Sequence, residues 1–236
     1  MTQPSTRKRT PYPPLVMDIS GEYACFTRPE LKAERVSYPV MTPSAARGAL
    51  EAVFWKPEFQ YRVLKIEVLN DIRWFSIRRN EVTEAPSLRT VTQTGPAYHF
   101  DAASNRDQRN MLGLRDVAYR IHATMELRPH ADSPVAKYRD QFRRRLERGA
   151  CFTHPYLGCR EFSCATFGPP DSSRTPIRRS EDLGVMLWDI DYSGASPRSW
   201  WFTAQLAAGV LNVPSEGIHD PARDRLIPPA AGQRGA

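Results

Sequence analysis

The sequence contains no run of about eighteen apolar residues, the length that a membrane-spanning helix needs. Its first residues, MTQPSTRKRTPYPP, are basic and rich in proline, and no apolar stretch of the kind found in a secretory signal follows them. We therefore expect a cytoplasmic protein with no membrane partner.

Cysteine and metal-binding motifs are also scarce. No H-x-x-x-H or H-E-x-x-H pattern occurs, and Asp189 and Asp191 in WDIDY are interpreted as structural residues on one strand face. The spacing of the cysteines does not form paired C-x-x-C motifs, so we expect reduced, mostly buried thiols and no metal. The four cysteines are Cys25, Cys151, Cys159 and Cys164.

A P-loop and a dinucleotide-binding fingerprint are both missing, which excludes ATP hydrolysis and dinucleotide redox chemistry and predicts no cofactor. What the sequence does have is positive charge. Lys and Arg number 33 against 26 Asp and Glu, giving a formal net charge of +7. This balance favours a polyanionic partner, either a nucleic acid or an acidic membrane surface, and charge alone does not choose between them.

Hydrophobic periodicity predicts an α+β fold. The expected elements are a strand at 15–26, a helix at 42–55, strands at 59–70, 72–82 and 116–128, and a helix at 135–149. Thr42 and Pro43 suit the first positions of the earlier helix. With a closing strand from within 151–167, this order is close to a ferredoxin-like β-α-β-β-α-β plan, and such a sheet often binds RNA on its open face.

The composition divides the chain into segments. We expect a flexible basic tail at 1–14, a core at 15–167 and a small β-rich C-terminal appendage at 168–213, followed by a second flexible tail at 214–236. A polar stretch at about 83–115 reads as a long insertion within the core.

Two of these segments leave alternatives open. The insertion carries Arg106, Arg109 and Arg115 and is either an arm that reaches RNA or a neighbouring subunit, or simply a mobile loop. The aromatic group in the appendage either fills a second small core or docks a partner. That group consists of Trp200, Trp201 and Phe202.

The helix VAKYRDQFRRRLERG, residues 135–149, is the strongest basic signal. Phe142 and Leu146, four residues apart, mark its buried edge. Its arginines are either a solvated face with ion pairs or, as we favour, a set spaced to reach successive phosphates. The arginines expected on exposed flanks are Arg139, Arg143, Arg144 and Arg148.

Two weaker basic clusters accompany the helix. Strand alternation sends Arg78 and Arg79 to opposite faces, so only one of them can share a groove with Asn80. In YLGCREF, Gly158 allows close backbone approach and presents Arg160 just after it.

Metal-free RNA cleavage is compatible with these residues, because RNA carries its own nucleophile in the 2′-OH and needs a base, an acid and positive charge on the phosphate. Lys137 is the candidate for that charge, and Tyr138 for holding or transferring a proton. The alternative is a lysine at a helix start and a packed tyrosine.

Four segments together point to a known family. They are GEYACFTRPELKAERVSYPVMTPSAARGALEAVFWKP, VLNDIRWFSIRRNEV, FRRRLERG and YLGCREF, and their order and spacing resemble the CRISPR-associated Cas5 family of type I-C systems. The resemblance covers most of residues 15–165.

The resemblance implies a RAMP-superfamily protein with a ferredoxin-like, RRM-related core. Members of this subtype typically cut precursor CRISPR RNA within the repeat without a metal. They then stay on the 5′ handle as a subunit of the type I-C Cascade complex, next to its backbone and large subunits. Target DNA is a partner only through the assembled complex.

The resemblance also places catalytic positions. The family's proposed site combines a tyrosine near the end of the first helix with a Lys-His pair, which here correspond to Phe54 and to Lys137 and Tyr138. Either cleavage is retained with another proton-transfer residue, or the chain chiefly binds the handle and assists assembly. The candidates besides Tyr138 are Tyr23, His122 and His154.

The positions expected to bind RNA are Arg47, Lys56, Arg78, Arg79, Asn80, Arg139, Arg143, Arg144, Arg145, Arg148 and Arg160. A third hypothesis is a basic protein unrelated to CRISPR that binds DNA or a membrane surface. It predicts no preference for repeat RNA over an unrelated hairpin, because phosphate contacts carry no sequence information.

Overall fold

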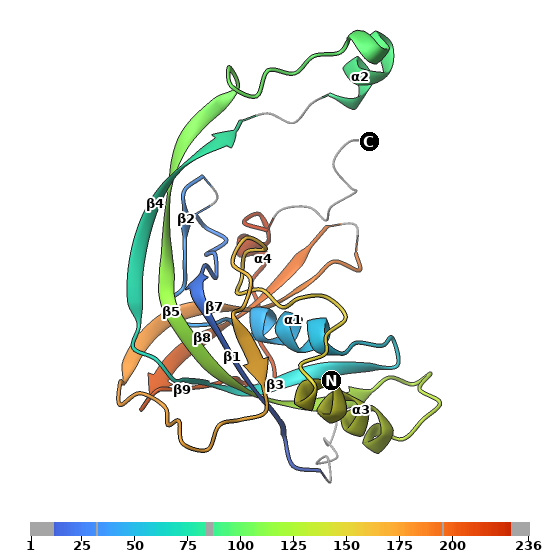
Figure 1. The fold of residues 1–236 in the computed structure, drawn as a ribbon, viewed down its shortest axis with the longest axis vertical. Helices are drawn as coiled ribbons and strands as arrows, with labels where there is room; N and C mark the ends of the chain where they lie inside the picture. Colours follow the sequence, from blue (N-terminus) through green and yellow to red (C-terminus); the bar gives the residue numbers. More distant parts are fainter. Residues whose placement is uncertain (1–11, 32, 84–86, 195, 228–236) are drawn as a thin grey trace.

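The computed structural model describes residues 12–31, 33–83, 87–194 and 196–227. It is a mixed α/β fold built around one curved, mostly antiparallel sheet (Figure 1). The strands are β1 Leu15–Ala24, β2 Arg35–Val36, β3 Phe59–Val68, β4 Arg73–Val82, β5 Arg106–Leu127, β6 Thr166–Gly168, β7 Glu181–Asp191, β8 Arg198–Ala207, β9 Val210–Asn212 and β10 Ile218–His219. The helices are α1 Pro43–Val53, α2 Leu88–Thr94, the 3-10 helix η1 Gly95–Ala97, α3 Val135–Glu147 and α4 Pro221–Asp224.

The centre of the sheet has the order β6-β1-β5-β3. Strand β5 runs antiparallel to both of its neighbours, with Leu15 of β1 opposite Ala123 and Phe59 of β3 opposite Leu127. The short strand β6 is the only part of the expected closing segment 151–167 that forms a strand among the described residues. It pairs antiparallel with β1.

Helices α1 and α3 cover one face of this sheet (Figure 1). Helix α1 begins as predicted, because the Thr42 side chain accepts a hydrogen bond from the Ala45 backbone N–H and Pro43 occupies the first turn. The core between helices and sheet is formed by alternate strand residues such as Met17 and Ile121, both fully buried. Burying each such side chain stabilises the folded state by about 1.5–3 kcal/mol.

Beyond the core, β4 and the first part of β5 form a long curved hairpin that extends away from the helices, with α2 near its end (Figure 1). The prediction of a loop through 83–115 is therefore wrong for 106–115, which pair with β4. Residues 106–110, RDQRN, are all polar, so the apolar alternation that marks a strand is missing in this part of β5. We call residues 73–115 the arm.

The C-terminal segment adds to the same sheet. Strand β9 pairs with both β3 and β8, and β7 pairs with β8. Phe202 packs in the main core, whereas Trp201 packs with Leu187 and Ile227 in a second, smaller cluster. A second small core was one of the two roles expected for this aromatic group.

The flexible tail predicted at 214–236 is wrong up to residue 227. Strand β10 pairs with β8, the Asp220 side chain caps α4, and Ile227 is only 5% exposed. Of the two predicted tails, residues 1–11 and 228–236 lie outside the described residues. In the part of the chain that is described, no helix is long and apolar enough to cross a membrane.

Candidate functional site

Helix α3 presents a cationic face to solvent. Lys137, Arg143, Arg144 and Arg148 are exposed there, and the first three line a shallow surface hollow together with Asp140 and Glu147. The ion pair from Arg143 to Asp140 is long, at 3.9 Å, and both side chains are well exposed. Exposed pairs of this kind are worth about 0–1 kcal/mol, so these cations remain available to a polyanion.

Arg139 does not belong to this face, and its predicted exposure is wrong. It is 2% exposed, its guanidinium donates to the Pro13 carbonyl, and it lies 5.3 Å from the Tyr12 ring. Burial holds its pKa below the ordinary value. In a helix with 3.6 residues per turn, residues 138, 139, 142 and 146 lie on one side, and in α3 this side is buried. Arg139 therefore points into the protein interior.

Arg145 is partly buried and joins α3 to α1. Its Nη1 donates to the Val53 carbonyl at 3.1 Å, and its guanidinium lies 5.2 Å from the Phe54 ring. A cation at the last carbonyls of a helix is favoured by the helix dipole. Arg145 is therefore held by the C-terminus of α1.

Lys137 and Tyr138 lie in the first turn of α3. The Lys137 side chain is exposed and its Nζ donates to Ser133 Oγ at 3.1 Å. Tyr138 is 2% exposed, and its hydroxyl donates to Asp132 Oδ1 at 3.1 Å. Burial raises the pKa of Tyr138, so its hydroxyl gives up its proton less readily than that of an exposed tyrosine.

Phe54 and Tyr138 both pack on Phe59, with ring centroids 5.5 Å and 5.3 Å away respectively. The structure thus brings to one aromatic group two of the positions that the resemblance predicts to be catalytic. Phe54 is itself 2% exposed, so this group is part of the hydrophobic core.

Two turns lie beside the start of α3. The Arg128 N–H donates to the Glu58 carbonyl at 2.8 Å, and His130 Nε2 lies 3.0 Å from the Pro57 carbonyl oxygen. His130 is exposed, and the sequence analysis did not single it out. The signal that locates His130 is the antiparallel register of β3 and β5. This register places the residues before Phe59 beside those after Leu127.

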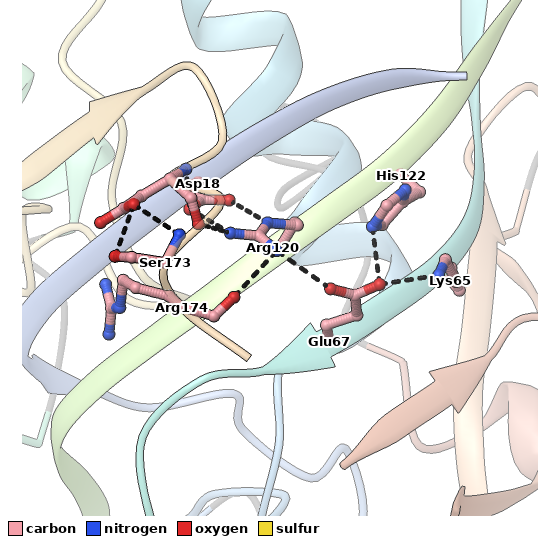
Figure 2. Close-up of polar contacts among 8 residues, drawn as sticks. Asp18, Lys65, Glu67, Arg120, His122, Ser173 and Arg174 are labelled. Atoms are coloured by element: carbon pink, nitrogen blue, oxygen red, sulfur yellow. Dashed lines mark hydrogen bonds and ion pairs between the residues drawn. The ribbon is translucent and has the colours of Figure 1, made fainter. Parts of the chain in front are cut away.

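The other face of the sheet carries a charged network (Figure 2). Arg120 makes two hydrogen bonds to the Asp18 carboxylate, at 2.7 and 3.0 Å, and approaches Glu67 at 3.6 Å. Glu67 also contacts His122 Nε2 at 2.9 Å and Lys65 Nζ at 2.7 Å. These groups balance one another's charge within the sheet.

Burial and neighbouring charged groups shift the pKa values of Glu67 and His122 in this network. Burial alone raises the Glu67 pKa, but the hydrogen bond from Lys65 and the nearby cations bring it below the ordinary value. The His122 pKa is lowered, mainly by burial and then by Lys65. The loop between β6 and β7 covers part of this face, since Arg120 also donates to the Arg174 carbonyl at 3.2 Å (Figure 2).

The three further candidates for proton transfer do not meet Lys137. His122 lies on the face opposite α3, because its neighbours Ile121 and Ala123 point into the core. His154 lies beyond the far end of α3, and the helix between Lys137 and Glu147 spans roughly 15 Å. Its Nε2 contacts the Cys164 carbonyl at 2.8 Å.

Tyr23 is also remote. It pairs with Arg115 on β5, and from there to Leu127, near α3, the strand runs roughly 40 Å. Its ring packs on Phe75 at 4.7 Å. Tyr23 thus belongs to the base of the arm.

The other predicted RNA-binding residues are dispersed. Arg47 is half-buried and pairs with Asp189 Oδ1 at 2.8 Å and Glu51 at 3.6 Å, which ties α1 to β7. Its pKa, which burial alone lowers, is raised by Asp189. Lys56 is partly exposed at the turn after α1.

On the arm, Arg78 and Asn80 are exposed on one face, while Arg79 lies on the other face and pairs with Glu161 at 2.6 Å. The prediction that Arg78 and Arg79 point to opposite faces is confirmed. Gly158 has a φ of +86°, and a Cβ there would lie 2.0 Å from the Cys25 carbonyl oxygen. The expected close approach is confirmed, and Arg160 is exposed just after it.

All four cysteines are free, and Cys25 and Cys164 are buried as expected. Within the described residues, no three His, Cys, Asp or Glu side chains are grouped as a metal ion needs.

Residues 14–213 match the sequence model of the family described as CRISPR-associated protein (Cas_Cas5). Two relatives are both named CRISPR pre-crRNA endoribonuclease Cas5d. The protein from Thermus thermophilus is 51% identical over 178 residues, covering 75% of this chain and 73% of that protein. The protein from Mannheimia succiniciproducens is 41% identical over 212 residues, covering 84% of this chain and 93% of that protein.

A solved structure named Crystal Structure of CRISPR-associated Protein has a TM-score of 0.62 at 20% identity, covering 86% of this chain and 92% of that chain. It shows a shared fold. With the family match over most of the chain and two relatives above 40% identity, the sequence comparison is decisive: the chain belongs to the CRISPR-associated Cas5 family, in its type I-C subtype.

Proposed function

We propose that this chain cleaves precursor CRISPR RNA within the repeat, without a metal, and then holds the 5′ handle as a cytoplasmic subunit of the type I-C Cascade complex. Two relatives that share 51% and 41% identity are named as pre-crRNA endoribonucleases. The observation that carries the proposal is the cationic face of α3, which leads to the exposed Lys137 at the position of the family's lysine.

The cleavage step uses the RNA's own 2′-OH. The 2′ oxygen forms a bond to phosphorus while the bond to the 5′ oxygen breaks, leaving a 2′,3′-cyclic phosphate and a 5′-hydroxyl. Negative charge grows on the phosphate oxygens as phosphorus becomes pentavalent, and Lys137 stabilises it there. Tyr138, whose hydroxyl is bonded to Asp132, acts by holding the start of α3 in place.

RNA binding involves the exposed cations of α3 and further basic positions on the surface. Arg143, Arg144 and Arg148 contact successive phosphates beside Lys137. Lys56, Arg78, Asn80 and Arg160 are exposed or partly exposed and extend the path along the chain. Arg47, Arg79, Arg139 and Arg145 act indirectly, since each of them is committed to a contact within the protein.

The core is, we propose, a ferredoxin-like, RRM-related fold of the RAMP type. Its support is the antiparallel order β6-β1-β5-β3 with α1 and α3 on one face. In the assembled complex the chain lies next to the backbone and large subunits and meets target DNA only there. The arm, whose end carries the exposed Leu88, is positioned to contact such a neighbour.

A second candidate function is a handle-binding and assembly subunit that has lost cleavage. It is favoured by the burial of Phe54 and Tyr138, both of which occupy family catalytic positions and are 2% exposed.

One experiment separates these functions. End-labelled repeat RNA is incubated in EDTA with the purified protein, beside the same RNA with a 2′-deoxy at the cut site and an unrelated hairpin at matched salt. We expect cleavage of the first RNA alone. Tight binding of both repeat RNAs with no cleavage would support the assembly function, and equal binding of the hairpin would support a sequence-independent basic protein.

A further inference from the structure

A site that uses Lys137 needs a group that removes the 2′-OH proton. Tyr138 is buried, and Phe54 has no proton to exchange. Histidine is the side chain that gains and loses a proton near neutral pH, so the five histidines are the first groups to test for position.

All five histidines lie in the described residues. His122 is on the opposite face of the sheet and His154 is past the far end of α3. His219 pairs with Asp224 in the C-terminal segment, at 2.9 Å. His99 lies in the arm, between η1 and β5. His130 is the remaining histidine, and it lies in the turn that leads into α3.

His130 is close to Lys137 through Ser133. The Cα atoms of residues three apart are at most roughly 11 Å from each other, and Ser133 Oγ is bonded to Lys137 Nζ at 3.1 Å. Both His130 and Lys137 are exposed. The imidazole of His130, in the turn before α3, and the ammonium of Lys137, in its first turn, are therefore both open to RNA that lies along the start of α3.

The contact with Pro57 orients the imidazole. A carbonyl oxygen only accepts hydrogen bonds, so in the neutral ring Nε2 carries the hydrogen that it donates to Pro57, at 3.0 Å. Nδ1 is then the unprotonated nitrogen. This is the arrangement of a general base whose second nitrogen is fixed by the backbone.

We propose that His130 is the general base of the RNA cleavage, an inference that rests on the proposed function of this chain. Nδ1 takes the proton of the 2′-OH as the 2′ oxygen forms its bond to phosphorus. The bond to the 5′ oxygen breaks, and that oxygen takes a proton from water, which reaches this exposed site. His130 then returns its proton to solvent, so the protein is unchanged at the end.

The test is single-turnover cleavage of end-labelled repeat RNA in EDTA by wild type, His130→Ala and His219→Ala. We expect His130→Ala to slow cleavage by about 10²–10⁴-fold, the usual contribution of a general base. RNA affinity and thermal midpoint stay near the wild-type values, because the side chain is exposed. His219→Ala removes a distant histidine and cleaves like the wild type.

Added imidazole provides a measurement that a purely structural role would not affect. Imidazole occupies the space left in His130→Ala and restores cleavage in proportion to its concentration, with no effect on Lys137→Ala. Wild-type cleavage by His130→Ala overturns the assignment and leaves the proposed function standing. Slow cleavage that imidazole does not restore, together with weakened RNA binding, also overturns it. A wild-type protein that binds but does not cleave overturns the proposed function and this inference together.

Discussion

Lys137 and Tyr138 are neighbours on α3, and their side chains point in different directions. The Lys137 ammonium is exposed and bonded to Ser133 Oγ at 3.1 Å, whereas Tyr138 is 2% exposed and packs on Phe59. A base and a phosphate-binding cation must reach the same RNA linkage. The positions of these two residues therefore separate the lysine, which we propose contacts the RNA, from the tyrosine, which packs against the core.

Replacing Lys137 by Ala tests the first of these roles. We expect cleavage of repeat RNA to fall by about 10²–10³-fold, because charge on the pentavalent phosphate loses its stabilising partner. RNA affinity changes only a few-fold, since one exposed phosphate contact among several is removed. Single-turnover rates and a binding titration measure the two effects.

Lys137→Arg and Lys65→Ala are the matched controls for that change. The first keeps the charge, and so retains RNA affinity. The second removes a lysine whose Nζ contacts Glu67 on the opposite face of the sheet, and we expect unchanged cleavage. If Lys137→Ala cleaves at the wild-type rate, Lys137 does not touch the reacting phosphate.

Arg139 and Arg143, one turn apart on α3, should respond differently to replacement by Ala. Arg139→Ala leaves the Pro13 carbonyl without its donor, so we expect a loss of about 1–3 kcal/mol in the free energy of unfolding and little change in RNA affinity per folded molecule. Arg143→Ala leaves the free energy of unfolding unchanged. It makes the slope of the logarithm of the RNA-binding constant against the logarithm of salt concentration shallower by about 0.7–0.9.

Urea denaturation and RNA titrations at several salt concentrations measure both variants. Equal RNA affinity of Arg143→Ala and wild type at low salt would argue that the cationic face of α3 is merely solvated.

Phe54 tests whether the family's tyrosine position still matters. Phe54→Leu keeps most of the apolar volume, and we expect modest destabilisation of about 1–2 kcal/mol and unchanged cleavage per folded molecule, because Phe54 supplies no proton. Phe54→Tyr should cleave within about threefold of the wild type. A gain of tenfold or more in Phe54→Tyr would return proton transfer to the end of α1 and contradict the role of His130.

Sequence patterns predicted the elements that have a strong local signal. Thr42 and Pro43 marked the start of α1, and Phe142 and Leu146 marked the buried side of α3. Alternation from Val117 onward marked the half of β5 that lies in the core. In each case an apolar face with a regular period packs on the rest of the protein, which is the condition under which periodicity is informative.

The features that were missed depend on contacts between distant segments. Arg139 is buried because the helical period carries it inward, although its residue type suggests exposure. His130 acquires its place from a contact with Pro57 in another turn. The segment after 214 is ordered up to Ile227 by packing on Trp201, which no local pattern of that proline-rich stretch reveals.

The Glu67 and His122 network predicts how stability depends on pH. The folded-state pKa of His122 is below its ordinary 6.5, so the unfolded chain binds the proton more readily, and stability is lost as pH falls through this range. The lowered pKa of Glu67 adds a further loss below its ordinary 4.5. We expect the free energy of unfolding to decrease steadily from pH 7 to pH 4.

His122→Gln is the variant that isolates the upper part of this dependence. It removes the group whose pKa lies below the ordinary 6.5, so urea midpoints should change less between pH 7 and pH 5 than in the wild type, while the decrease below pH 4.5 remains. His99→Gln, at an exposed site in the arm, should follow the wild-type curve. A His122→Gln curve identical to the wild type would show that another group causes the acid loss.

The arm can be shortened without disturbing the core, because the described residues of its tip contribute nothing to the buried clusters. Helix α2 has no buried residues, and the Thr83 N–H donates to the Asn105 carbonyl at 2.9 Å, so a two-residue Asn-Gly turn can join Thr83 to Asn105 in place of 84–104. We expect the thermal midpoint to stay within about 2 °C of wild type and repeat RNA cleavage to stay within threefold.

Assembly with the backbone and large subunits, measured by size-exclusion chromatography, should weaken at least tenfold if the arm contacts a neighbour. Because residues 106–115 pair with β4, deleting the whole of 83–115 would instead destabilise the protein, and an assembly defect seen only in that larger deletion would identify the tip as a loop without a partner.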